Sequence, residues 1–263
     1  MPSYSKHHVS LPTPLRPHPR AIIIGASSGI GEAVALRLAD QGYLLALLAR
    51  REKNLKMLCE KINQQAGERR AIYYIHDITQ PDVVPSLLQK IVADMGGLDV
   101  FIFSAGITRP PGIRNFDINK DLLTMQVNLL GALAWLNPVA ALFQQLRSGQ
   151  IVGISSVAGE RGRVGNPAYN ASKAALTCYL EALRNRLTRY GVNVLTIKPG
   201  FVQTDSLQEA KRTFWVITPD QAATGICKAI EKRKQEVYLP AIWRWVMLIV
   251  RNIPSIIFRR MNF

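Results

Sequence analysis

Near its N-terminus the chain reads Ala21-Ile22-Ile23-Ile24-Gly25-Ala26-Ser27-Ser28-Gly29-Ile30-Gly31. The apolar run at residues 21–24 predicts a buried strand, and the pattern from Ala33 to Leu38 predicts a helix. Between them, three glycines allow a tight turn and a close approach of the backbone to another group. This order of strand, glycine turn and helix is typical of the first unit of an α/β fold.

The glycine turn predicts a dinucleotide site. A pyrophosphate would meet the unpaired N–H groups at the positive end of the helix dipole. The spacing GxxxGxG differs from the GxGxxG fingerprint, and such a turn can also be merely a tight connection between strand and helix. Because a strand and a helix flank it as the motif requires, we favour nucleotide binding.

The alternation of apolar runs and amphipathic stretches continues along the chain. Strands are expected near residues 20–24, 43–49, 71–76, 98–103, 149–155, 192–198 and 235–239, with helices between them. This pattern predicts an α/β protein with a single-domain, doubly wound, mostly parallel sheet of the Rossmann type. We expect a flexible basic leader at 1–19, a dinucleotide-binding catalytic domain at 20–240 and an apolar, basic, helical C-terminal extension at 241–263.

Tyr169 and Lys173 are four positions apart in a predicted helix. Positions i and i+4 share a helix face, so the Lys173 ammonium can lie beside the phenol and favour its ionised form. A free phenol has a pKa of about 10, so this shift would prepare it for proton transfer. Ser156 could donate a hydrogen bond to a substrate carbonyl oxygen. Ordinary exposed helices carry such pairs too, so the interpretation depends on the rest of the chain.

Further motifs supply that context. They are Asp77, Ser104-Ala105-Gly106, Val127-Asn128-Leu129, and Pro199-Gly200 followed by Thr204. With the glycine turn, Ser156, Tyr169 and Lys173, these motifs resemble the short-chain dehydrogenase/reductase family from about residue 20 to residue 240, in the family's order. Ser104 departs from the asparagine that is usual in the family, and a hydroxyl offers fewer hydrogen bonds than a carboxamide.

The resemblance implies roles for the matching residues. The implied catalytic residues are Asn128, Ser156, Tyr169 and Lys173. The implied cofactor-binding residues are Gly25, Ser27, Ser28, Gly29, Ile30, Gly31, Arg50, Arg51, Asp77, Ile78, Ser104, Ala105, Gly106, Tyr169, Lys173, Pro199, Gly200, Val202 and Thr204. It also implies a homodimer or homotetramer that assembles through the two long helices around Asn128 and Tyr169.

The end of the second predicted strand bears on the choice of cofactor. A carboxylate there would bind the ribose hydroxyl of NAD and repel the extra phosphate of NADP. This chain instead has Arg50 and Arg51, and a guanidinium can pair with a phosphate. We therefore expect NADP(H), with Arg50 favoured over Arg51, although both could simply begin a basic, solvated helix.

The resemblance implies hydride transfer between NADP(H) and a carbonyl or secondary alcohol, and we expect the direction of carbonyl reduction. It also implies that Tyr169 protonates the oxygen, Ser156 orients it, Lys173 assists the tyrosine and contacts the nicotinamide ribose, and Asn128 holds a water. The alternative is a catalytically silent regulatory or scaffold protein that retains the fold. The intact set of four residues favours the enzyme.

Composition narrows the class of protein. The formal net charge of +15 would attract anions, but no nucleic-acid recognition motif is present. The three cysteines and four histidines lack metal-ligand spacing, so no metal site is expected. The leader has no long apolar run typical of a signal peptide, and we expect a cytoplasmic protein.

The segment from Trp243 to Arg251 combines apolar residues with arginines. It suits a helix lying on a membrane surface, or one that packs over the substrate crevice or on a neighbouring subunit. Three loops, at 108–116, 158–168 and 203–217, would select the substrate. Phe214 and Trp215 favour a lipophilic or 3-oxoacyl-type substrate, although they could equally pack in a small apolar cluster beside the main core. The first two loops contain Arg109, Arg161 and Arg163. These arginines could contact an anionic group of the substrate, but arginines on loops are more commonly solvated at the surface.

Overall fold

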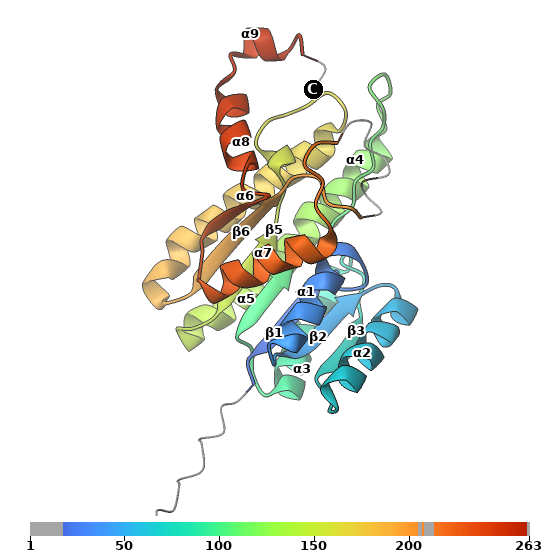
Figure 1. The fold of residues 1–263 in the computed structure, drawn as a ribbon, viewed down its shortest axis with the longest axis vertical. Coiled ribbons are helices and arrows are strands. Elements are labelled where there is room, and N and C mark those ends of the chain that lie inside the picture. The colour runs from blue at the N-terminus through green and yellow to red at the C-terminus, as the bar shows by residue number, and fades with distance from the viewer. Residues whose placement is uncertain (1–17, 205–206, 208–212, 262–263) are drawn as a thin grey trace, which may run out of the picture.

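The structure is a computed structural model, and it describes residues 18–204, 207 and 213–261 (Figure 1). Nearly all of the leader expected at 1–19, and part of the expected loop at 203–217, lie outside the described residues.

Seven parallel strands form one sheet in the order β3-β2-β1-β4-β5-β6-β7. They are β1 (Arg20–Ile24), β2 (Leu44–Ala49), β3 (Ala71–Ile75), β4 (Val100–Phe103), β5 (Gln150–Ile154), β6 (Asn193–Pro199) and β7 (Glu236–Leu239). Each lies within its predicted range, except that β6 ends one residue beyond it, and the parallel sheet confirms the predicted fold class. The strands are nearly continuous apolar runs because helices cover both faces of the sheet.

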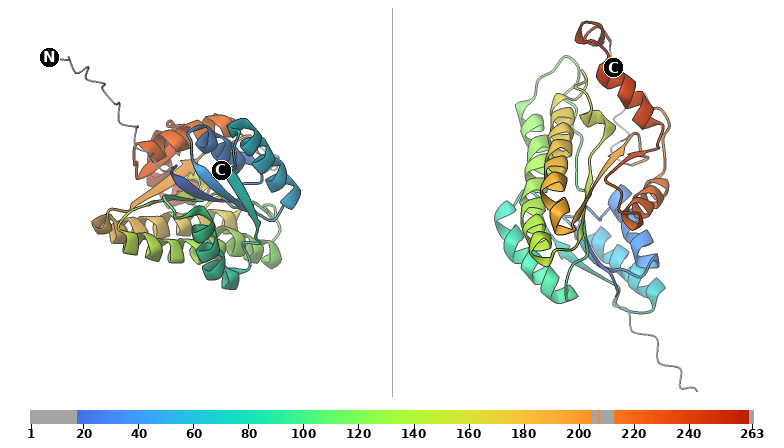
Figure 2. Two further views of the ribbon diagram at one scale, coloured as in Figure 1. Left: turned by 90° about the horizontal axis from the view of Figure 1, so that it is seen from below. Right: turned by 90° about the vertical axis from the view of Figure 1, so that its left-hand side faces the viewer.

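Helices pack on the two faces of the sheet (Figure 2, left). The helices are α1 (Gly29–Asp40), α2 (Glu52–Ala66), α3 (Val84–Met95), α4 (Ile118–Met125), α5 (Gly131–Leu146), α6 (Pro167–Leu187), α7 (Pro219–Glu231), α8 (Trp243–Asn252) and α9 (Ser255–Phe258). Short turns of helix are η1 (Pro81–Val83), η2 (Gln126–Leu130), η3 (Val157–Gly159) and η4 (Thr188–Tyr190). One apolar core lies beneath α1, α2 and α7, and the other beneath α3, α5 and α6.

The strand order reverses direction at β1, which lies between β2 and β4. In open α/β sheets the loops on either side of such a reversal diverge and leave a crevice that binds ligands. The two loops meet at the base of that crevice, because a Cβ on Gly25 would lie 2.6 Å from the Ala105 nitrogen. Glycine at position 25 is therefore required for the loops to approach this closely.

Helices α4 and α5 form one continuous helix through the π-helical turn η2. Within the described residues this helix alone, from Ile118 to Leu146, has the length and composition needed to cross a membrane. Half of its apolar window is buried in the protein, as is usual for a helix that packs in a core.

The C-terminal extension leaves the end of β7 and lies beyond the carboxyl edge of the sheet (Figure 2, right). Its helix α8 packs in a third, smaller cluster with Val157 of η3 and Tyr238 of β7. A Cβ on Gly200 would overlap the Trp243 ring, so α8 also touches the loop after β6. The helical extension was expected, whereas its bend before α9, at Pro254, and its contact with η3 were not.

Candidate active site

The glycine turn is shaped for close approach. Gly25 and Gly29 have φ of +84° and +60°, a region that residues with a Cβ rarely adopt. A Cβ on Gly31 would overlap the carbonyl oxygen of Gly25, so only glycine allows α1 to start against the turn. The Ser28 side chain does not cap the first turn of α1. The N-terminal amide groups of α1 are therefore not occupied by the serine that commonly caps such a turn.

Arg51, rather than Arg50, contacts the glycine turn. Its guanidinium donates to the Ser27 hydroxyl across 3.1 Å and also to the Ser28 hydroxyl. Arg50 instead lies near Asp77, and its charge helps to lower the pKa of that carboxyl. The larger cause of the lowered pKa is a hydrogen bond from the Thr79 backbone N–H. The structure thus brings both arginines to the rim of the crevice, with Arg51 and not the expected Arg50 at the glycine turn.

Asn128 lies in the π-helical turn η2, an irregularity that often marks functional sites. Its carboxamide accepts from the Ile107 N–H at 2.8 Å and donates to the Ile107 carbonyl at 2.9 Å. It also donates to the Ser172 hydroxyl. The buried carboxamide therefore joins the segment after β4 to α6, which carries Tyr169 and Lys173.

Lys173 is turned toward the sheet. Its Nζ donates to the Ile154 carbonyl at 2.9 Å and lies 5.9 Å from the centre of the Tyr169 ring. A Cβ on Gly106 would lie 3.4 Å from both this Nζ and the Asn128 Oδ1. Asn128, Lys173 and the segment that follows β4 therefore meet at one point.

The pKa of Tyr169 is raised, chiefly because burial disfavours the phenolate. A hydrogen bond with Ser156 and the positive charge of Arg163 act in the opposite direction. Burial also lowers the pKa of Lys173 to about 8. We expected the Lys173 charge to lower the pKa of Tyr169, but burial outweighs the groups that lower this pKa, and Lys173 is not one of them. The lysine amine is directed at a backbone carbonyl, and its own charge is disfavoured by burial.

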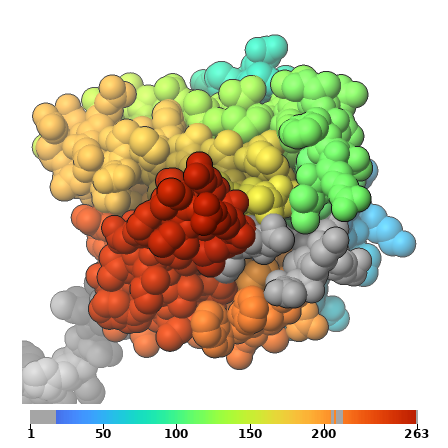
Figure 3. All heavy atoms as spheres, turned by 90° about the horizontal axis from the view of Figure 1, so that it is seen from above, coloured from blue at the N-terminus to red at the C-terminus, as the bar shows by residue number. Residues whose placement is uncertain are grey.

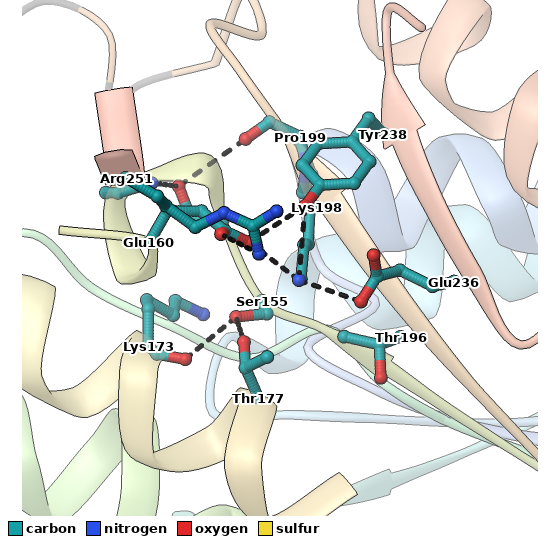
Figure 4. Close-up of polar contacts among 12 residues, drawn as sticks. Ser155, Glu160, Lys173, Thr177, Thr196, Lys198, Pro199, Glu236, Tyr238 and Arg251 are labelled. Carbon is teal, nitrogen blue, oxygen red and sulfur yellow. Dashed lines mark hydrogen bonds and ion pairs between the residues drawn. The ribbon is translucent and has the colours of Figure 1, made fainter. Parts of the chain in front are cut away.

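Ser156 caps the turn η3. Its hydroxyl accepts from the Ala158 N–H at 3.0 Å and donates weakly, across 3.4 Å, to the Pro199 carbonyl. The neighbouring Ser155 donates to the Lys173 carbonyl at 2.9 Å, which fixes the start of α6 against β5 (Figure 4). The ends of β5, β6 and α6 are thereby held together around the phenol.

The other predicted cofactor residues lie around the same crevice. Thr204 faces the glycine turn, because its Cγ2 would lie 3.0 Å from a Cβ on Gly29. Val202 forms a single bridge with Ile217, and the Ser104 N–H donates to the Ile24 carbonyl. Ile30 is half-buried against the core beneath α1. The Ile78 side chain is buried against Gly131 and the core.

A buried ion-pair cluster next to Ser156 was missed from the sequence. Lys198 Nζ lies 2.6 Å from Glu160 and 2.8 Å from Glu236, and the Tyr238 hydroxyl donates to Glu160 (Figure 4). Arg251 of α8 completes it, 3.3 Å from Glu160. Isolated charged residues in a sequence carry no signal that they will be buried together.

Arg161 also has a role that the sequence did not reveal. Its guanidinium donates to the carbonyls of Val250, Arg251 and Ile253 and lies 4.2 Å from the centre of the Phe258 ring. It therefore binds the end of α8 and contacts α9, which corrects the expectation that it is solvated or meets an anionic ligand. Seen from above, these C-terminal helices lie beside the loop of residues 157–166 (Figure 3).

Comparison with known proteins identifies the family. The model of the short chain dehydrogenase family matches residues 19–214. The chain belongs to this family. It is 29% identical to an uncharacterized oxidoreductase of Mycobacterium tuberculosis over 88% of this chain and 91% of that protein. It is also 29% identical to the ketoacyl reductase HetN of a Nostoc species, over 82% and 76% of the two chains.

A solved structure has the same fold. A variant of actinorhodin polyketide ketoreductase, crystallised with NADPH, matches this chain with a TM-score of 0.76 and 24% identity, over 84% of this chain and 95% of that one. The protein is thus an oxidoreductase of the short-chain dehydrogenase family with the family's fold.

Proposed function

We propose that the protein is an NADP(H)-dependent oxidoreductase that transfers a hydride between the nicotinamide and a carbonyl or secondary alcohol. The observation that carries the proposal is the convergence of Asn128 and Lys173 on Gly106. This contact joins the predicted cofactor loops to the helix that bears Tyr169. A scaffold that had lost catalysis would have no need to keep a buried lysine beside a half-buried phenol.

The residues at the crevice fit a dinucleotide phosphate. The close-packed glycines let a pyrophosphate approach the amide groups at the start of α1. Arg51 and Arg50 place positive charge at the rim, and the residue directly after β2, where a carboxylate would repel a second phosphate, is Arg50. These features favour NADP(H) over NAD(H).

The bound cofactor would supply or accept the hydride. Tyr169, whose raised pKa favours the protonated phenol, would donate its proton to the carbonyl oxygen in the direction of reduction. Ser156 would orient that oxygen by a hydrogen bond. Lys173 would contact the nicotinamide ribose, and Asn128 would hold the local backbone and a water that links the site to solvent.

A lipophilic ketone or a 3-oxoacyl thioester is the substrate class that we propose, with reduction as the main direction. One relative is named a ketoacyl reductase and one similar structure is a polyketide ketoreductase. Phe214 and Trp215 are exposed at the loop after β6, next to Trp243 of α8. These aromatic rings could contact an apolar substrate, which supports the proposed substrate class.

Assembly through α4, α5 and α6 is proposed as well. Leu122 and Leu130 are exposed apolar residues on the long helix that carries Asn128. A second copy packed there would cover them, giving a homodimer or homotetramer in the cytoplasm.

The test measures oxidation of NADPH and NADH with a series of 3-oxoacyl thioesters and apolar ketones. We expect turnover with NADPH, a loss of at least about a thousandfold in Tyr169→Phe, and nucleotide binding within about threefold of wild type. Tyr190→Phe removes a hydroxyl far from the site and serves as the matched control. Equal turnover in Tyr169→Phe would overturn the mechanism, and binding without turnover on any carbonyl would favour the scaffold.

A further inference from the structure

The C-terminal helices expose an apolar surface. Helix α8 buries Trp243, Met247 and Val250, yet its other side leaves Trp245 and Ile249 exposed, the latter at 69%. Ile256 and Ile257 of α9 are exposed as well. Packing against the protein's own core therefore uses only one side of this extension.

Other loops add exposed apolar residues at the same edge of the sheet. Ile113 and Phe116 follow β4, Val164 follows β5, and Phe214 and Trp215 follow β6. Phe116 is 99% exposed. Because all the strands are parallel, these loops and the extension lie beyond one edge, around the candidate site. Figure 3 looks down on this face, with α8 and α9 in dark red, the 157–166 loop in yellow and the loop after β4 in green.

The charge of this face is positive. Residues 241–263 contain four arginines and no acidic residue, and residues 107–116 contain two arginines and no acidic residue. Glu160 neutralises Arg251, whereas Arg244, Arg259 and Arg260 are exposed beside the apolar residues. Apolar side chains flanked by arginines match the boundary between acyl chains and anionic headgroups.

A cavity of about 550 Å³ lies at the edge of this face, between α9 and the start of α6. Val164, Phe258 and Met261 give it apolar walls, and Arg259 is at its rim. An acyl chain with an anionic headgroup has the same division into apolar and charged parts.

We propose that this face, made of α8, α9 and the loops at 107–116, 157–166 and 213–217, docks on an anionic lipid bilayer. The protein would lie on the surface, since α8 has ten residues and carries Arg244 and Arg251, and is too short to span the hydrocarbon. Docking in this orientation turns the crevice toward the bilayer, where a lipophilic substrate can enter without crossing water. That last step rests on the proposed function, whereas the docking does not.

The test is sedimentation of the full chain with vesicles of phosphatidylcholine alone, or of phosphatidylcholine with phosphatidylglycerol. We expect binding to the anionic vesicles only. Trp245→Glu and Ile249→Glu should each weaken it at least tenfold. Met57→Glu is the matched control, because Met57 of α2 is 59% exposed, outside the proposed face, and its replacement should leave binding unchanged.

The charge contribution has its own pair of variants. Arg259→Gln with Arg260→Gln should weaken binding to anionic vesicles several-fold. Arg186→Gln with Arg189→Gln, which removes two charges near the end of α6, should not. Equal losses in the two pairs would mean that only the net charge of the chain acts, and would overturn the assigned face.

Two further outcomes would overturn the proposal. One is a folded wild type that binds neither kind of vesicle. The other is a dimer in light scattering without lipid that Ile249→Glu dissociates, which would make a second copy of the chain the occupant of this face. Neither readout depends on turnover, so a failure of docking is distinguishable from a failure of the proposed activity.

Discussion

Glu160 Oε1 lies 2.6 Å from Lys198 Nζ, and both side chains are only 5% exposed. Glu160 comes four residues after Ser156, and Lys198 directly precedes Pro199 at the end of β6. Arg251 joins the same carboxyl group from α8. One buried pair therefore connects the turn that bears Ser156, the loop after β6 and the C-terminal helix.

Removing the buried charge should destabilise the fold. Glu160→Gln leaves Lys198 buried with Glu236 as its remaining partner, and we expect the free energy of unfolding to fall by about 3 kcal/mol. Glu236→Gln is the control, because the Glu236 side chain is 41% exposed, and its loss should cost less than about 1 kcal/mol. Urea denaturation at neutral pH measures the free energy of unfolding of both variants. Equal losses would contradict the argument that the buried carboxylate matters more than the exposed one.

The buried lysine gives stability a pH dependence. Lys173 has a folded pKa of about 8, below its unfolded value of about 10.4. Between these values the unfolded chain binds more protons, so this group's contribution to stability increases as pH rises and is lost as pH falls through the folded pKa. The stability of wild type relative to Lys173→Met should rise by about 2 kcal/mol from about pH 7 to about pH 9.5. Urea denaturation at the two pH values tests this, and an unchanged difference would contradict it.

Close packing at the glycine turn predicts a strong effect of one methyl group. Gly31→Ala would force α1 away from the Gly25 carbonyl, so nucleotide binding should weaken at least about tenfold and stability should fall by about 2 kcal/mol. Gly162→Ala is the matched control, because a Cβ there meets nothing within 4 Å. Tryptophan fluorescence quenching by NADPH and thermal unfolding provide the two measurements. A Gly31→Ala variant that binds like Gly162→Ala would disprove the close approach.

Cofactor selectivity should depend more on Arg51 than on Arg50. The Arg51 guanidinium is already held at the glycine turn by Ser27 and Ser28, whereas Arg50 lies toward Asp77. Arg51→Gln should weaken NADPH binding about tenfold to a hundredfold, Arg50→Gln less, and neither should change NADH binding much. Titration calorimetry with both nucleotides separates the effects. Equal losses for NADH would assign the arginines to the shared part of the two cofactors.

The order of elements could be predicted from the sequence, since strands buried on both faces are apolar runs and the helices between them are amphipathic. The glycine turn and the residues Asn128, Ser156, Tyr169 and Lys173 could be located for a related reason. Glycines and short motifs act at fixed places relative to the strand ends, and the parallel sheet brings those ends to one edge.

Tertiary structure decided which partners the long side chains have and how deeply they are buried. Arg51 rather than Arg50 meets the turn, Lys173 is directed at the Ile154 carbonyl, and Arg161 binds the end of α8. The pairing of Glu160 with Lys198 was likewise decided by the tertiary structure. A long charged side chain can reach many partners, so its partner does not follow from the local sequence. Its burial does not follow either, because the segments that cover it are far apart in the chain.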